Sequence, residues 1–311
     1  MKPALVIGHR GQDGRLLMER FAREGREAVG VGRQECDILS RAAVADLVKR
    51  VQPGEIYYLP AYHHSSEEKV QIDDSELLRR SYEVHVGGLS HFLEAMKAHS
   101  PRSRLFYAAT SHVFGNSGIP LQDEKTPFNP PNIYGLTKVA GIHTCRFYRT
   151  VHGVFAAAGI LYNHESRYRR ETFVSQKIIR AALRVQEGAS DPIVLGDLSA
   201  RVDWGYAPDY VDAMVRMLAL PEPDDFVVAT GEARSVMEFV ECAFGQLGLE
   251  WRPYVRENST LITKGISMLC GNADKLRKLT GWEPTVTFAE MVSLLLGKSP
   301  DRVVSRASIA G

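Results

Sequence analysis

The stretch VIGHRGQDGRLL, residues 6–17, decides the fold. It joins a short apolar run to a segment in which apolar residues recur at helical spacing, and it places Gly8, Gly11 and Gly14 in a G-x-x-G-x-x-G pattern. Glycines at these points permit a tight turn and let the backbone approach a pyrophosphate at the N-terminus of the following helix. In this strand–turn–helix context, the pattern predicts a dinucleotide-binding loop.

Apolar and amphipathic segments alternate along the first half of the chain. Strands are expected at residues 3–8, 28–32, 55–61, 104–110 and 154–163, and helices at 14–28, 41–53, 76–99 and 133–153. Strict alternation of this kind favours an α/β fold with a Rossmann-type, doubly wound parallel sheet. The first domain is therefore expected to be a dinucleotide-binding core over residues 1–162.

After residue 163 the pattern is less regular. The chain is expected to return to the core near residues 203–230 and otherwise to build a smaller C-terminal substrate-binding lobe, mainly over 163–298. Within this lobe, residues 235–249 and 288–297 are expected to be helices. Residues 299–311 lack an apolar stripe and are expected to form a flexible tail.

The composition is ordinary for a soluble globular protein, with 44% hydrophobic and 24% charged residues among 311. A formal net charge of +1 gives no reason to expect nucleic acid or a membrane surface as a partner. The four cysteines form no C-x-x-C pair, which argues against a zinc site and favours a reducing compartment. With no leader segment and no apolar run near the length of a membrane helix, we expect a cytoplasmic protein without a metal.

Arg33 follows the second expected strand, about 20 residues after the glycine loop, where a ribose-reading residue belongs. A carboxylate there would hold the 2′-hydroxyl of NAD, whereas an arginine can pair with the 2′-phosphate of NADP. The sequence therefore favours NADP, with NAD as the alternative. Asp37 and Ile38 follow closely and are expected to flank the adenine.

Tyr134 and Lys138 are four residues apart in an expected helix and so share one face of it. A lysine ammonium beside a phenol is expected to lower the pKa of the tyrosine. The tyrosine can then exchange a proton with a substrate hydroxyl while hydride moves to or from a nicotinamide. Thr110, at the end of an expected strand, is placed to hydrogen-bond the same substrate oxygen.

Several longer motifs carry a family resemblance. They include YNHES at 162–166, ETFVSQKI at 171–178 and DWGYAPDYV at 203–211, together with the glycine loop and TPFNPPNIYGLTK at 126–138. With these motifs the chain resembles the extended short-chain dehydrogenase/reductases that act on nucleotide sugars, most closely the GDP-mannose 4,6-dehydratases. The resemblance implies an NAD(P)-dependent enzyme with a nucleotide-diphosphate sugar, GDP-linked, as its substrate.

The motifs and the resemblance together give the expected site residues. The expected catalytic residues are Thr110, His112, Tyr134 and Lys138. The expected cofactor-binding residues are Gly8, Gly11, Gln12, Asp13, Gly14, Arg33, Asp37, Ile38, Leu59, Ala61, Tyr134, Lys138, Leu161, Asn163 and His164. The expected substrate-binding residues are Ser111, Asn163, Glu165, Lys177, Arg201 and Lys264.

His112 departs from the family pattern, which has Thr-Ser-Glu where this chain has Thr110-Ser111-His112. In the dehydratases that glutamate removes the C5 proton and protonates the departing C6 hydroxyl. Three interpretations stay open: an imidazole that replaces the acid/base carboxylate, a residue that shapes the substrate pocket of a reductase or epimerase, and a structural histidine.

Two further departures concern the substrate and the assembly. Val202 and Ile262 stand where the family has arginines that grip the sugar diphosphate, and Lys264, Arg201 or Arg252 are candidates to compensate. The family's arginine-bearing insertion after the second strand, which reaches a neighbouring subunit in tetramers, is missing. We therefore expect a homodimer formed through the helices at 76–98 and 134–152.

Three functions follow in order of preference. The first is a GDP-mannose 4,6-dehydratase-like reaction with hydride transfer at C4. The second is a reductase or epimerase acting on a 4-keto nucleotide sugar, which the missing glutamate favours. The third is a non-catalytic protein that only keeps the cofactor site.

Overall fold

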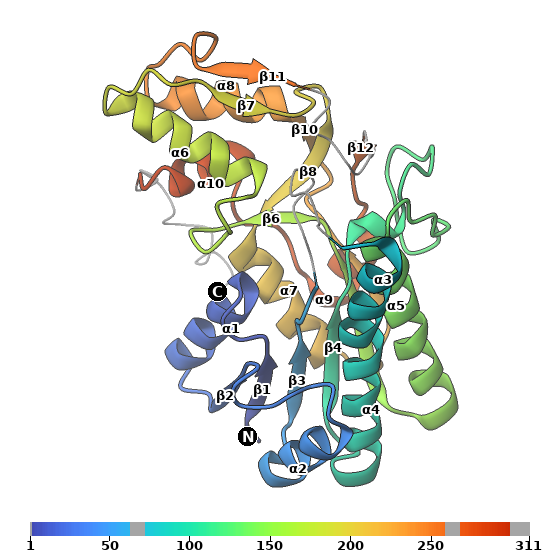
Figure 1. Ribbon diagram of the computed structural model, residues 1–311. Coiled ribbons are helices and arrows are strands. Elements are labelled where there is room, and N and C mark those ends of the chain that lie inside the picture. Colours follow the sequence, from blue (N-terminus) through green and yellow to red (C-terminus); the bar gives the residue numbers. More distant parts are fainter. Residues whose placement is uncertain (1, 63–71, 259–267, 299–311) are drawn as a thin grey trace.

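The computed structural model describes residues 2–62, 72–258 and 268–298 (Figure 1). The histidines at 63 and 64, Ile262, Lys264 and the tail expected at 299–311 lie outside these ranges. None of the helices in the described ranges has the length and apolarity that a membrane crossing needs.

Six parallel strands form the main sheet in the order β2-β1-β3-β4-β5-β9. Their bounds are β1 (Ala4–Ile7), β2 (Ala28–Val31), β3 (Glu55–Tyr58), β4 (Arg104–Ala108), β5 (Phe155–Leu161) and β9 (Asp225–Val228). The chain runs outward from β1 to β2 and then crosses back to β3 on the other side of β1. This reversal leaves a crevice at the carboxyl ends of β1 and β3, and it confirms the expected Rossmann-type sheet.

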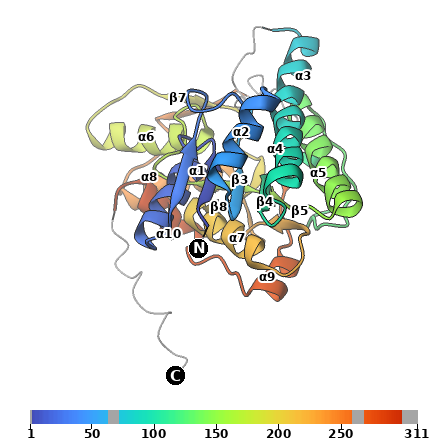
Figure 2. The same cartoon turned by 90° about the horizontal axis from the view of Figure 1, so that it is seen from below.

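Helices cover both faces of this sheet (Figure 2). On one face lie α2 (Arg41–Val51), α4 (Gly88–His99) and α5 (Ile133–His152), which pack side by side, with α3 (Asp74–Tyr82) against α5. On the other face α1 (Gln12–Arg23) packs against α7 (Ala207–Ala219). The core between these layers is apolar and closely packed, with strands such as β1 and β9 buried on every residue.

One expectation about these helices was wrong. The single helix expected at 76–99 is interrupted by a π-helical turn, Glu83–Gly87, between α3 and α4. The Tyr58 hydroxyl donates to the Val84 carbonyl in this turn at 2.5 Å. Gly88, which follows the turn, leaves room for that hydroxyl, because a Cβ there would lie 2.4 Å from it. The phenol of Tyr58 therefore takes a backbone carbonyl that a regular helix would use itself, and the helical pattern in the sequence contains no sign of this.

The second lobe is built on a short mixed sheet with β8 (Arg201–Tyr206) at its centre. The strands β10 (Ala233–Ser235), β12 (Met268–Leu269) and β6 (Asn163–Glu165) all pair with β8. A separate ribbon joins β7 (Ile193–Leu195) to β11 (Val255–Glu257), and α6 (Val174–Gln186), α8 (Val236–Gln246) and α10 (Phe288–Leu295) enclose a second hydrophobic core. The short helix α9 (Asp274–Thr280) packs against α7 and β9.

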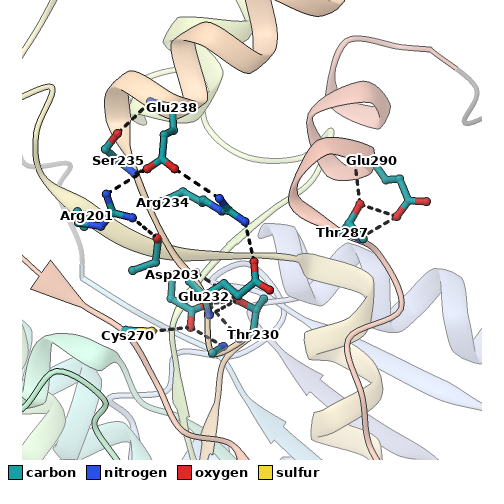
Figure 3. Close-up of polar contacts among 12 residues, drawn as sticks. Arg201, Asp203, Thr230, Glu232, Arg234, Ser235, Glu238, Cys270, Thr287 and Glu290 are labelled. Carbon is teal, nitrogen blue, oxygen red and sulfur yellow. Dashed lines mark hydrogen bonds and ion pairs between the residues drawn. The ribbon is translucent and has the colours of Figure 1, made fainter.

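Asp203, fully buried on β8, ties this lobe to the end of β9 (Figure 3). Its carboxylate accepts hydrogen bonds from the backbone and hydroxyl of Thr230, at 2.9 and 2.7 Å, and from the backbone of Gly231 at 2.9 Å. Burial raises the pKa of Asp203, and these hydrogen bonds oppose that rise. The two lobes are thus joined by a buried and largely satisfied carboxylate rather than by an exposed linker.

Candidate active site

A cavity of about 1320 Å³ lies between the two lobes, at the carboxyl ends of β1, β3, β4 and β5. The structure brings most of the expected site residues to its wall. These are Gly8, Gly11, Gln12, Asp13, Gly14, Arg33, Asp37, Ile38, Leu59, Ala61, Thr110, His112, Tyr134, Lys138, Leu161, Asn163, His164 and Arg201. One continuous space therefore reaches from the glycine loop to Tyr134 and on to the second lobe.

The glycine loop makes close contacts that leave no room for side chains. A Cβ on Gly14 would lie 2.5 Å from the carbonyl oxygen of Gly8, and Gly8 itself has φ +85°. The first backbone N–H groups of α1 have no side-chain cap, because the residue before the helix is Gly11. A loop so close to the helix, with free N–H groups at its end, fits the pyrophosphate of a dinucleotide.

Asp13 and His164 join this loop to the second lobe. His164 Nε2 lies 3.0 Å from Asp13 Oδ1, and its Nδ1 donates to the Tyr162 carbonyl at 2.7 Å. Burial favours the neutral form of each side chain. The charge of the partner and the hydrogen bond with it act in the opposite direction and prevail, so the pKa of Asp13 is lowered and the pKa of His164 is raised. Gln12 adds a hydrogen bond to the carbonyl of His164 at 3.0 Å. The two residues expected to contact cofactor thus also hold β6 against the glycine loop.

Arg10 is a cavity-lining residue that the sequence analysis missed. It stands between Gly8 and Gly11, and its guanidinium pairs with Glu35 at 2.8 Å. Glu35 in turn accepts from the backbone of Gly32 at 2.7 Å, next to Arg33. Two arginines therefore converge on the end of β2, and the position of Arg10 inside the glycine motif was the available signal.

Tyr134 and Lys138 lie on one face of α5, as expected, and burial is the largest influence on the pKa of both side chains. Lys138 is buried and donates to the Ala108 carbonyl at 2.7 Å, and its Nζ is 5.8 Å from the centre of the Tyr134 ring. Burial lowers the pKa of Lys138 to about 7. Burial raises the pKa of Tyr134 to about 12, against the opposing effects of Arg169 and a hydrogen bond with Thr110. The hydrogen bond of Lys138 goes to the Ala108 carbonyl, and the effect of Lys138 on the pKa of Tyr134 stays a prediction.

His112 lines the cavity beside Tyr134. It lies in a short 3-10 turn, Ser111–Val113, and its ring packs edge-to-face on the tyrosine, with 6.0 Å between ring centres and 82° between planes. Its Nδ1 is 3.4 Å from the side-chain nitrogen of Asn132, which also caps the N-terminus of α5. The imidazole is therefore held at the cavity next to the phenol.

Three expected substrate residues lie away from the described lining of the cavity. Ser111 is almost fully buried, and Glu165 accepts from Ser175 at 2.6 Å and pairs with Arg169 at 3.3 Å. Lys177 lies on α6 and also lies outside the described lining. Arg201 does line the cavity, but it pairs with Glu238 at 3.2 Å and donates to the Ala233 carbonyl (Figure 3).

The segment between β6 and α6 supplies a part of the wall that sequence reasoning did not assign. Its lining residues are Tyr168, Arg169, Arg170, Thr172 and Phe173. Arg169 lies over the Phe173 ring, 3.8 Å from its centre, whereas Arg170 is exposed and forms no ion pair with the described part of the chain. Outside the cavity, Arg167 pairs with Glu19 of α1 at 3.0 Å. The basic run in this segment was the signal that could have drawn attention to it.

Among solved structures, two of the similar chains show the same fold. RMD from Pseudomonas aeruginosa, complexed with NADPH, aligns with a TM-score of 0.81 at 20% identity and covers 96% of this chain and 98% of its own. UDP-glucose 4-epimerase from Thermus thermophilus, complexed with NAD, aligns with a TM-score of 0.80 at 21% identity, covering 95% and 98%.

Sequence relatives are closer. The chain is 34% identical to GDP-mannose 4,6 dehydratase 2 of Arabidopsis thaliana, in an alignment that covers 95% of this chain and 86% of that protein. It is 33% identical to GDP-mannose 4,6 dehydratase of Drosophila melanogaster, with 94% and 84% covered. The model of the family described as GDP-mannose 4,6 dehydratase matches residues 34–295. This chain belongs to the GDP-mannose 4,6-dehydratase family.

Proposed function

We propose that the protein is an NADP-dependent 4,6-dehydratase of a GDP-linked hexose. The observation that carries the proposal is the grouping of Thr110, Tyr134, Lys138 and His112 on one wall of a cavity whose far end is the glycine loop. Membership of the dehydratase family supports the substrate class. We further propose that residues 1–162, with returns near 203–230, form the cofactor core and that the nucleotide-sugar lobe begins with β6.

The residues at the glycine loop fit the cofactor. The loop admits a pyrophosphate at the N-terminus of α1, and Arg33 supplies positive charge for a 2′-phosphate, whereas Arg10 beside it is paired with Glu35. Bound NADP would accept hydride from C4 of the sugar and later return it to C6. A carboxylate is missing at position 33, where NAD specificity would place one, and this favours NADP.

Proton transfers fall to the residues of α5 and of the turn after β4. Tyr134 takes the proton of the 4-hydroxyl as that carbon is oxidised, and Thr110 hydrogen-bonds the same oxygen. Burial raises the pKa of Tyr134 to about 12, and the charge of Arg169 and the hydrogen bond with Thr110 oppose that rise and so favour the phenolate that this step needs. The 4-ketone acidifies the C5 proton, which the neutral imidazole of His112 removes. The imidazolium then gives that proton to the C6 hydroxyl, which leaves as water. Hydride return to C6 leaves an enolate across C5 and the 4-oxygen, and C5 takes up the proton that Tyr134 accepted from the 4-hydroxyl, which restores the phenolate.

His112 also supports a second candidate function. A reductase or epimerase of a 4-keto nucleotide sugar needs Tyr134 and the cofactor but no acid/base carboxylate at position 112. The half-buried imidazole against the tyrosine ring would then shape the sugar pocket.

One pair of assays separates the two functions. The protein is incubated with GDP-mannose and catalytic NADP, and separately with GDP-4-keto-6-deoxymannose and stoichiometric NADPH. We expect a 4-keto product in the first tube with no net change in NADPH. Consumption of NADPH in the second tube, with no reaction in the first, would favour the reductase. If the protein binds NADP but neither sugar nucleotide, the substrate assignment is wrong.

We also propose that the protein is a homodimer. Large apolar side chains are exposed on α3 and α5, which pack against each other: Tyr82 is 50% exposed, Leu136 49%, Phe147 53% and Val151 58%. Exposed apolar side chains grouped on neighbouring helices suit the equivalent face of a second copy.

A further inference from the structure

Tyr134 has a second imidazole neighbour, besides His112, that the sequence analysis did not single out. His85 lies in the π-helical turn between α3 and α4 and is fully buried. Its ring meets the Tyr134 ring edge-to-face, with 5.4 Å between centres and 78° between planes. His85 is absent from the described lining of the cavity, so it approaches the tyrosine from inside the protein.

Both nitrogens of His85 are hydrogen-bonded, and the partners define the tautomer. The backbone N–H of Tyr62 can only donate, and it lies 3.0 Å from Nε2, so Nε2 carries no proton. Nδ1 therefore carries the single proton of the neutral ring and donates to the Thr137 hydroxyl oxygen at 2.7 Å. The Thr137 hydroxyl in turn donates to the carbonyl of Ile133 at 2.9 Å.

The ring stays neutral. Burial, and to a lesser extent the charge of Lys138, hold the pKa of His85 well below 6.5. A protonated ring would lose its acceptor for Tyr62 and would point its Nε2–H at the backbone N–H of Tyr62. The arrangement is therefore built for one tautomer.

These contacts connect two walls of the cavity. Thr137 lies on α5 between Tyr134 and Lys138, and Tyr62 directly follows Leu59, Pro60 and Ala61, which line the cavity after β3. The π-helical turn places the imidazole between these two segments, and such turns often mark functional positions in helices. Loss of the His85 imidazole would remove the side chain that packs against the Tyr134 ring from inside the protein.

We propose that His85 is a positioning residue that fixes the Tyr134 ring and the segment after β3 relative to each other, without contacting substrate or cofactor. The proposal rests on the proposed function in one respect only: the reaction whose rate is measured is the nucleotide-sugar reaction. A displacement of about 1 Å at a reacting group can cost roughly 100-fold in rate, so the effect should appear in turnover rather than in binding.

The test compares His85→Asn with His99→Asn. His85→Asn keeps a hydrogen-bond donor for Thr137 but removes the aromatic ring and the acceptor for Tyr62. His99 is the control because it is exposed at the far end of α4. For His85→Asn we expect kcat to fall roughly 10- to 100-fold, with KM for the nucleotide sugar and Kd for NADP changed less than about twofold. His99→Asn should match the wild type. A folded His85→Asn variant with wild-type kcat would overturn the proposal.

Thr137→Val is a second, smaller change that guards against misfolding of the first variant. It should also lower kcat, and combining it with His85→Asn should cost less than the product of the two single effects. Fully multiplicative effects would show that His85 does not act through Thr137.

If the wild-type protein turns over no nucleotide sugar, the proposed function is refuted but the positioning role of His85 is not. That role is then tested by NMR of ring-labelled tyrosine, in which the Tyr134 signal is assigned by its loss in Tyr134→Phe. We expect the Tyr134 ring to flip faster in His85→Asn than in wild type and His99→Asn. An unchanged flip rate would overturn it.

Discussion

Asp13 and His164 form an ion pair, 3.0 Å between Oδ1 and Nε2, that joins the glycine loop to β6, the first strand of the second lobe. The side chains are only 18% and 10% exposed. This pair explains how two segments 151 residues apart in sequence keep a fixed geometry around the cavity.

We expect Asp13→Asn to lower the free energy of unfolding by about 3 kcal/mol, because it leaves a buried imidazolium without its counter-charge. Arg167→Ala removes an exposed pair, Arg167–Glu19, and should cost less than about 1 kcal/mol. Urea denaturation of the two variants checks the difference. Equal effects would show that the buried pair is no stronger than the exposed one.

The pair also predicts a pH dependence of stability. The pKa of His164 is raised from 6.5, so its contribution is complete below 6.5 and is lost as pH rises through the folded-state value. The pKa of Asp13 is lowered from 3.8, so its contribution is present above 3.8 and is lost as pH falls through the folded-state value. Subtracting the urea-derived stability curve of Asp13→Asn from that of wild type should give a plateau between these limits. A flat difference at all pH values would contradict the shifts.

Arg33→Ser should weaken NADP binding roughly tenfold and leave NAD binding nearly unchanged, because only NADP has the 2′-phosphate with which arginine pairs. Titration calorimetry with both cofactors measures the two dissociation constants. A parallel loss for NAD and NADP would instead indicate a general effect on the fold of the loop.

Arg170→Ala should raise KM for the nucleotide sugar roughly tenfold, with Kd for NADP unchanged. Arg170 lines the cavity without an ion-pair partner in the described part of the chain, so its charge is available for the sugar diphosphate. Arg167→Ala is the matched control from the same segment, since Arg167 pairs with Glu19 outside the cavity. If both variants behave alike, Arg170 does not contact the diphosphate.

His112→Ala should reduce dehydration of GDP-mannose by at least about 100-fold, and His112→Glu should retain a substantial part of it, because either a carboxylate or an imidazole can move the C5 proton. The measurement is the amount of 4-keto product that each variant forms. Near-normal dehydration by His112→Ala would remove His112 from the acid/base role and leave it a pocket-shaping one.

Phe147→Lys should convert the dimer to a monomer, because it puts a charge into the apolar face of α5. Light scattering after gel filtration gives the mass of each form. Lys49→Ala, at an exposed position of α2 outside the expected interface, serves as a surface control. If wild type is monomeric, or Phe147→Lys remains dimeric, this face is not the interface.

Local patterns were enough to predict the parallel sheet, the glycine loop and the pairing of Tyr134 with Lys138 on one helix face. Each depends on spacing within a few residues, which backbone geometry converts directly into structure. The π-helical turn at Glu83–Gly87 was missed because its contacts come from Tyr58, which belongs to a different strand.

The sequence by itself determined a Rossmann-type α/β fold with a glycine loop and a tyrosine–lysine pair, and it singled out His112 as the departure from the family pattern on which the choice between the proposed reactions rests. Only the tertiary structure decided which groups surround Tyr134. Lys138 interacts with Ala108, the charge of Arg169 opposes the rise that burial causes in the pKa of the phenol, and His85 packs against its ring. These neighbours come from β4, the segment after β6 and the turn before α4, so their approach depends on packing between distant segments that no local spacing encodes.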